Sequence, residues 1–391
     1  MALPTFIDIS SALGDVSNWH NGAIIPATLD TTTKKHGYSS LTMAASGGTN
    51  AMDTSNVSGS AAATSRMSAY IRFDTLNSIT IRARGALAAI CWNLAVNASG
   101  KLVLTSSSGT LTKTGATTLA VNTWYRIAVG WTLTTTSNFT INVWLDGGSV
   151  AEIAATNADG TLNDAVPKDL AVLQPAGSSN IWWSDFVIDA ATGNGDLGGV
   201  GNDCYVSAKL PTGIGSNGAY TTNGTGTGTG TGHAPYVNER PWDSTSYLNQ
   251  TSGGSLDEDF AIQAASVGDD DLTGWSLLMR VSWQIARLTG GGAAPTVSIF
   301  DNGSVTAFTP PASFSGSTPT YIYTTSSTYP ATAPIVGQRS TKGSGKVPAM
   351  AQCGIVLVAS KTIAAAGRTT KNTRSWALGM DVGMNWRNGN G

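Results

Sequence analysis

Residues 124–145 read WYRIAVGWTLTTTSNFTINVWL, and this stretch decides the fold class of the chain. Large apolar side chains occupy every second position in two runs: Tyr125, Ile127, Val129, Trp131, and then Phe139, Ile141, Val143, Leu145. Because successive side chains of a β-strand point to opposite faces, each set lies on one face of a strand. The polar segment 132–138 is predicted to connect the two strands. A turn that accepts positive φ is predicted at Asp146-Gly147-Gly148.

The same alternation recurs on both sides of this hairpin. Shorter period-two segments separated by Gly, Asn or Ser occur at residues 68–71, 79–82, 89–96 and 101–104. Closely spaced strands joined by turns are typical of an antiparallel β-sandwich.

The composition supports an all-β chain of two domains. With 391 residues the chain exceeds the usual size of one domain, about 100–200 residues. Glutamate occurs three times, at Glu152, Glu239 and Glu258, against twenty-one aspartates, and Gly occurs 46 times. Glutamate, a helix former, is therefore scarce, whereas the abundant Asp and Gly favour turns over helix interiors, so long helices are not expected.

Charge, cysteine content and hydropathy exclude several function classes. The formal net charge is −2 and no segment concentrates Lys or Arg, so nucleic-acid binding is not expected. Cys91, Cys204 and Cys353 are widely spaced and odd in number, which predicts buried free thiols rather than a disulfide framework or a zinc site. The first residues have no signal-peptide pattern and no later run is apolar enough for a membrane span, so we expect synthesis in a cytoplasm and no membrane partner.

A family resemblance rests on the hairpin and on one later strand. Residues 122–129 and 141–147 resemble the central hairpin of laminin-G-like, concanavalin-type jelly rolls, and residues 181–189 resemble the closing strand of those domains. The resemblance covers about residues 1–190. It implies a jelly-roll sandwich, and calcium at its rim, for which Asp146, Asp159 and Asp164 are the loop acids to inspect.

A boundary is predicted between the two halves. Residues 192–202 are rich in Gly and Asn and read as a linker, so the predicted domains are 1–192 and 203–391. Alternating Gly and Thr at 224–232 predicts a loop that is mobile or ordered by a partner. Strands are predicted at 260–262, 276–285, 296–300, 321–323, 354–358 and 376–384, although the apolar spacing of 275–288 also fits a short helix. A second β-sandwich is favoured.

The second half resembles tailed-bacteriophage virion proteins. The resemblance rests on Val206–Pro211, His233, the Val237-Asn238-Glu239-Arg240-Pro241 segment and Thr245–Leu248, and it covers most of residues 203–391. It implies a non-enzymatic virion structural protein that decorates or cements a head, or extends a fibre or tail. Its partners would be major capsid or tail proteins, and it would form a homo-oligomer, a trimer being our expectation.

Few residues offer catalytic or metal-binding chemistry. His20, His36 and His233 are isolated from any catalytic motif, and each is expected at the surface or in a structural contact. A glycosidase would need paired carboxylates in one cleft, so no catalytic residue and no enzyme activity are predicted. The acidic clusters 257–259 and 269–271 could hold Ca²⁺ or could solvate turns, and no other cofactor is indicated.

Tryptophans carry the alternative hypothesis, a glycan-binding adhesin or receptor-binding protein for a host surface polysaccharide. Trp144, Trp182 and Trp183 are the candidate glycan or partner contacts, with Trp92 a fourth aromatic of the same kind. Adjacent Trp182 and Trp183 must point to opposite faces of a strand, so one is expected in the core. An exposed Trp or Tyr beside Asn or Asp would favour glycan binding over a purely structural role.

Overall fold

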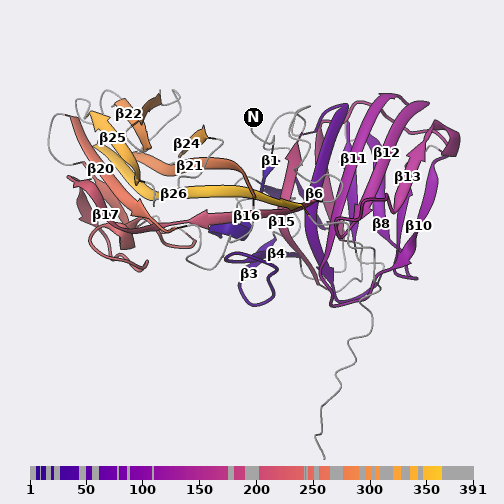
Figure 1. The fold of residues 1–391 in the computed structure, drawn as a ribbon, viewed down its shortest axis with the longest axis horizontal. Helices are drawn as coiled ribbons and strands as arrows, with labels where there is room; N and C mark the ends of the chain where they lie inside the picture. Colours follow the sequence, from indigo (N-terminus) through magenta and orange to yellow (C-terminus); the bar gives the residue numbers. More distant parts are fainter. Residues whose placement is uncertain are drawn as a thin grey trace, which may run out of the picture.

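The regular secondary structure of the described residues is almost entirely β-strand (Figure 1). In the computed structural model the structure describes residues 6–8, 10–14, 19–21, 27–43, 50–54, 61–76, 79–85, 89–107, 110–174, 180–189, 202–241, 243, 245–250, 255–264, 276–289, 296–301, 304–308, 320–326, 335–341 and 347–362. The helices of these residues are single turns: α1 (Ser10–Leu13), η2 (Asn157–Asp159) and η3 (Ala234–Tyr236). The predicted all-β fold class is confirmed.

Two antiparallel sheets form the N-terminal sandwich. Sheet A has the strand order β13-β12-β11-β6-β15-β4-β3, with β1 paired to β15. Its strands are β1 (Phe6–Ile7), β3 (Thr28–Asp30), β4 (Ser40–Met43), β6 (Thr64–Phe73), β11 (Tyr125–Thr135), β12 (Asn138–Leu145), β13 (Ile153–Thr156) and β15 (Ile181–Asp189). Sheet B has the order β10-β9-β8-β7-β14-β5-β2. Its strands are β2 (His20–Asn21), β5 (Asn50–Asp53), β7 (Thr80–Arg84), β8 (Ile90–Val96), β9 (Lys101–Thr105), β10 (Thr112–Thr118) and β14 (Asp169–Gln174).

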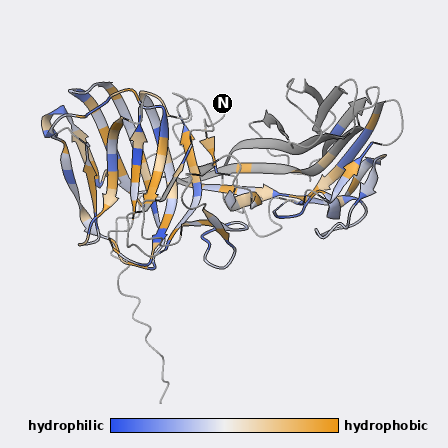
Figure 2. Ribbon diagram, turned by 180° about the vertical axis from the view of Figure 1, so that it is seen from behind, coloured by the Kyte–Doolittle hydropathy of each residue, from blue (hydrophilic) through white to orange (hydrophobic). Residues whose placement is uncertain are grey.

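The period-two pattern accounts for this sandwich. Along β12 buried and more exposed residues alternate, and Figure 2 shows hydrophobic and hydrophilic residues alternating along the strands of this half. The inward side chains of both sheets form one apolar core that contains Trp92, Trp131 and Trp183. Asp146 and Gly147 have φ of 49° and 69°, so the positive-φ turn is confirmed.

One detail of the predicted hairpin is wrong. The polar segment 132–138 is not a long connector, because β11 continues to Thr135 and β12 already begins at Asn138. Threonine is β-branched and favours strands when one face meets solvent, so a polar run of threonines extends the sheet here.

Two further sheets form the second sandwich. Sheet C has the order β18-β19-β26-β21-β24, with β16 paired to β26, and sheet D has the order β17-β20-β25-β22-β23. Sheet C contains β16 (Asn202–Lys209), β18 (Thr221–Asn223), β19 (Tyr247–Asn249), β21 (Ser276–Thr289), β24 (Thr320–Ser326) and β26 (Val347–Thr362). Sheet D contains β17 (Pro211–Gly218), β20 (Ser255–Ile262), β22 (Thr296–Asp301), β23 (Ser304–Phe308) and β25 (Ile335–Thr341). Side chains of both sheets, such as Phe260 and Leu357, share one core.

The segment that also fitted a helix is a strand. β21 pairs with β26 on one side and β24 on the other. Two neighbouring strands supply its backbone with hydrogen-bond partners, which a sequence pattern does not reveal.

The Thr-Gly loop, residues 224–232, contains no strand, as predicted. The side chains that hydrogen-bond to it and hold it in place belong to this chain and not to a partner. Thr227 donates its backbone N–H and its hydroxyl to Glu239 Oε1 at 2.7 and 2.8 Å. Asn238 Oδ1 accepts from the backbone N–H of Thr229 at 3.0 Å, and Asn238 Nδ2 donates to the carbonyl of Pro211 at 2.8 Å. The adjacent pair Asn238-Glu239 therefore fastens a loop that the sequence indicated to be mobile or ordered by a partner.

A buried polar junction joins the two sandwiches, which lie end to end in Figure 1. Asp185, buried on β15 with φ of 55°, accepts from the backbone N–H of Val206 on β16 at 2.8 Å and contacts His36 Nδ1 at 3.0 Å. The Arg240 guanidinium stacks 4.8 Å from the Tyr38 ring centroid. The hydrogen bond of Asp185 to the backbone of Val206 and the cation–π contact of Arg240 with Tyr38 join the two halves to each other.

Some predictions fall outside the described residues. These are the strand at 376–384, the linker at 192–201 and the acidic cluster 269–271. The boundary between domains 1–192 and 203–391 stays a prediction, although sheets A and B draw their strands from residues 6–189 and sheets C and D from 202–362. No helix in the described residues is long and apolar enough to cross a membrane.

Candidate functional site

The outer face of sheet A carries an ordered array of polar side chains. Strand register aligns four threonines from four neighbouring strands in one row: Thr64, Thr132, Thr140 and Thr156. The next row consists of Arg66, Gly130, Asn142 and Ala154, and the row after that contains Ser68, Ala128 and Trp144. We call the open part of this array the Trp144 face: Thr64, Arg66, Thr132, Thr140, Asn142 and Trp144.

Trp144 lies along the sheet instead of pointing away from it. A Cβ atom added to Gly130 would meet the six-membered ring of Trp144 at 3.1 Å (Cζ3) and 3.3 Å (Cη2). Gly130, on the neighbouring strand, therefore makes room for the indole, which stays half-buried. One side of the indole covers the glycine, and the ring is partly exposed. Asn142, the register partner of Gly130, lies two residues before Trp144 on the same face of β12.

The other two predicted tryptophan contacts do not join this face. Trp183 is fully buried in the core, so it is not a contact residue for any ligand. Trp182 points to the outer side, as alternation requires, but it is only 8% exposed. Its Nε1 donates to Asp30 Oδ2 at 2.8 Å, and the Arg72 guanidinium covers its ring at 4.5 Å. Trp92 is also buried in the core.

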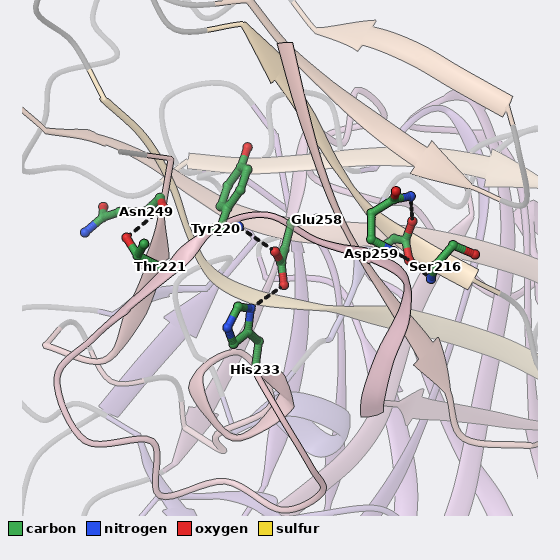
Figure 3. Close-up of polar contacts among 8 residues, drawn as sticks. Ser216, Tyr220, Thr221, His233, Asn249, Glu258 and Asp259 are labelled. Atoms are coloured by element: carbon green, nitrogen blue, oxygen red, sulfur yellow. Dashed lines mark hydrogen bonds and ion pairs between the residues drawn. The ribbon is translucent and has the colours of Figure 1, made fainter. Parts of the chain in front are cut away.

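The acidic cluster 257–259 does not gather its carboxylates. Glu258 and Asp259 are adjacent on β20, both are fully buried, and they point in different directions (Figure 3). Glu258 accepts from the backbone N–H of Tyr220 at 2.8 Å and contacts His233 Nδ1 at 2.8 Å. Asp259 Oδ2 accepts from Asn217 Nδ2 at 2.6 Å. These contacts fasten residues 216–233 to β20, and they do not form a calcium cage.

Burial dominates the electrostatics of Glu258. Desolvation raises the pKa of its carboxyl above the ordinary value, although hydrogen bonds from Tyr220 and His233 oppose the rise. Asp259 adds a smaller increase to the same pKa because it is a neighbouring like charge.

The loop acids expected at the rim each stabilise a turn. Asp146 accepts from the backbone N–H of Arg126 at 2.9 Å, and Asp164 accepts from that of Val166 at 3.0 Å. Asp159 closes the capping box of η2 and pairs with Lys113 at 2.8 Å. The three carboxylates hold three separate turns. Among the described residues no group of three or more His, Cys, Asp or Glu side chains could hold a metal ion.

The remaining reactive residue types also have structural contacts. Glu152 accepts from the hydroxyl of Thr117 at 2.8 Å, which joins the edge strands of the two N-terminal sheets. His36 and His233 contact Asp185 and Glu258, and the side chain of His20 lies outside the described part.

Cys91, Cys204 and Cys353 are buried free thiols, as predicted. Burial raises the pKa of the Cys91 thiol to about 12, which keeps it protonated at neutral pH.

Comparisons with known proteins identify no family for this chain. Neither a family model nor a curated protein sequence matches the chain. Similar solved structures include a sialidase (TM-score 0.37, 9% identity, covering 48% of this chain and 19% of that one). They also include an endo-β-1,4-glucuronan lyase from the fungus Trichoderma reesei (0.36, 11%, 48% and 96%) and the Caenorhabditis elegans galectin LEC-6 (0.24, 10%, 44% and 98%).

At such TM-scores the likeness assigns no activity to this chain.

Sequence reasoning named Trp144 but missed the array around it. The available signal was the alternation Thr132, Gly130 and Ala128 on one strand and Thr140, Asn142 and Trp144 on the next. Only the register of β11 against β12 shows that Gly130 lies beside Trp144.

Proposed function

We propose that this chain is a non-enzymatic surface protein whose N-terminal sandwich binds a glycan at the Trp144 face. The observation that carries the proposal is the half-buried Trp144 indole, which lies over Gly130 next to Asn142. A partly exposed aromatic near an amide favours an adhesin over a purely structural protein.

The chemistry of the Trp144 face fits a sugar. The apolar face of a pyranose ring stacks on an aromatic ring, while its hydroxyls need hydrogen-bond donors and acceptors at the edge of that ring. Asn142 offers both, and the exposed Thr132 and Thr140 form the neighbouring row, Thr140 two residues before Asn142 on β12 and Thr132 opposite Thr140 on β11. The exposed Arg66 adds a donor across the glycine.

The non-enzymatic part of the proposal is supported by the carboxylates. Hydrolysis of a glycosidic bond needs two carboxylates that face one substrate. Glu152 and Glu258 are about a domain apart in sequence and each accepts hydrogen bonds within its own sandwich. Neither lies on the Trp144 face.

The second sandwich would carry and orient the first. The junction at Asp185 and Arg240 supports this role because it couples the two halves through buried polar contacts. Placement on a bacteriophage virion, contact with major capsid or tail proteins, and a trimeric state stay predictions from the sequence.

The test is glycan binding by the full chain and by variants of Trp144. A glycan array of bacterial surface polysaccharides selects a ligand, and isothermal titration calorimetry then measures its affinity. Trp144→Ala is expected to weaken binding about tenfold or more, since stacking contributes about 1–2 kcal/mol. Trp144→Phe keeps a ring and is expected to retain most of the affinity.

Thr222→Ala, at an exposed position on β18 of the second sandwich, is the matched control and should bind like the wild type. If the full chain bound no glycan on the array, or if Trp144→Ala bound as tightly as the wild type, the proposal would be wrong. The structural role in a virion would then be the better explanation.

A further inference from the structure

The outer face of sheet B contains two arginines on one strand in different electrostatic situations. Arg82 and Arg84 both point outward from β7, because the intervening Ala83 is in the core. Arg84 is neutralised twice: its Nε lies 2.6 Å from Asp169 Oδ1, and its Nη2 lies 2.9 Å from Asp53 Oδ2.

Arg82 has no such counter-charge. Its Nε donates to Asn93 Oδ1 on the neighbouring β8 at 2.8 Å. Within the described residues, the Arg82 side chain makes this one hydrogen bond, to an uncharged group. The two terminal amino groups of the guanidinium therefore keep their hydrogen-bond donors for something outside the described chain. Asn93 Oδ1 is engaged by Arg82, so the amide nitrogen of Asn93 is a further donor at the same place.

The protein also makes the charge of Arg82 unfavourable. Burial lowers the pKa of Arg82, and the positive charge of Arg84 lowers it further. An uncompensated, half-buried cation beside another cation costs free energy that a bound anion would recover.

The surroundings of Arg82 are those of a shallow binding surface for a sugar chain. Asn93 and Thr105 continue its row on β8 and β9, and exposed Thr112 follows on β10. In the adjacent row the half-buried Ala95 and Val103 provide an apolar strip. With strands about 4.8 Å apart, this row from β7 to β10 is about 14 Å long.

We propose that Arg82 and Asn93 form a second binding site, on the face opposite Trp144, that takes the carboxylate of an acidic polysaccharide. A guanidinium presents a planar pair of N–H groups that matches the two oxygens of a carboxylate. The threonine hydroxyls and the apolar strip then contact the sugar that bears it. This site is independent of the proposed glycan site at the Trp144 face, and either can fail without the other.

The experiment is affinity electrophoresis and calorimetry of the full chain with polygalacturonate, with neutral dextran and poly-glutamate as comparison polymers. Wild-type protein is expected to bind polygalacturonate more tightly than dextran, and added salt should weaken that binding. Arg82→Gln is expected to lower the affinity about tenfold or more. Arg82→Lys keeps the charge but loses the planar pair, so an intermediate loss is expected.

Lys34→Gln is the matched control, because it removes one positive charge at an exposed position between β3 and β4, outside both proposed sites, and it should bind polygalacturonate like the wild type. The thermal midpoint of each variant shows whether it is folded, and Arg82→Lys replaces Arg82→Gln in the comparison if the latter unfolds.

Four outcomes would overturn the proposal. The first is an absence of polygalacturonate binding by the wild type, and the second is equal binding by Arg82→Gln. The third is an equal loss of binding in Lys34→Gln, which would show that binding follows the net charge alone. The fourth is equal or tighter binding of poly-glutamate, which would assign the surface to acidic peptides.

Discussion

The two sandwiches use similar strands but place their charged side chains differently. In the N-terminal sandwich Glu152, Arg84 and Asp169 lie at sheet edges or on an outer face, whereas Asp8 and Asp185 are buried. In the second sandwich Glu258 and Asp259 are fully buried. Asp259 holds Asn217, which precedes the Thr-Gly loop, and Glu258 holds His233, which directly follows it. Both sandwiches contain buried carboxylates, but in the second sandwich two of them are adjacent on one strand, and each must be satisfied by hydrogen bonds.

Two glutamates test this difference most strongly. Glu258→Ala removes the acceptor of the buried Tyr220 N–H and the partner of His233, so a loss of about 3 kcal/mol in the free energy of unfolding is expected. Glu152→Ala removes a comparable acceptor from Thr117 at a half-exposed edge, and about 1 kcal/mol is expected. Urea unfolding of both variants measures the two losses. Equal losses would show that the second sandwich does not depend on its buried charges.

A smaller effect is expected from the ion pairs on sheet B. Arg84→Gln removes the positive charge that pairs with Asp53, which is 5% exposed, and with Asp169, and should lower stability by about 2 kcal/mol. Arg82→Gln on the same strand removes an uncompensated charge and should leave stability nearly unchanged. The same urea titration compares the two variants, and a larger loss for Arg82→Gln would contradict the assigned difference between these arginines.

The smallest effect concerns pH. Because the pKa of Glu258 is raised above 4.5 in the folded state, the folded protein takes up a proton that the unfolded chain does not. The stability from this group is fully present below pH 4.5 and is lost as the pH rises through the raised value. Each unit between the two pKa values corresponds to about 1.4 kcal/mol.

The pH effect is isolated by Glu258→Gln, which cannot titrate. The difference in thermal midpoint between wild type and Glu258→Gln should move in favour of the wild type as the pH falls from neutral towards 5. A difference that stays constant with pH, or moves the other way, would show that the folded-state pKa of Glu258 is not raised.

The sequence predicted the sandwich better than it predicted the sites. Alternation at 124–145 predicted β11 and β12, and adjacency alone predicted opposite directions for Trp182 and Trp183. The sequence could not show which of these two tryptophans would be the core residue. The calcium hypothesis for 257–259 failed because neighbouring acids on a strand point to opposite faces, each towards its own partners.

For the Thr-Gly loop, the sequence predicted the absence of a strand but not the residues that hold the loop in place. Its composition correctly indicated that it would not form a strand, since alternate glycines have no side chain to pack. The groups that fasten it, Asn238 and Glu239, follow several residues later and carry no signal that they turn back to Thr227 and Thr229.

By itself the sequence determined that this protein is all-β, because a period of two in apolar side chains is a local property of each strand. The tertiary structure alone decided which outward side chains become neighbours, since register brings Trp144 to Gly130 and Arg82 to Asn93 from different strands. The pairing and register of strands depend on the packing of the whole sandwich, whereas the alternation of apolar and polar residues is a property of each strand's own sequence.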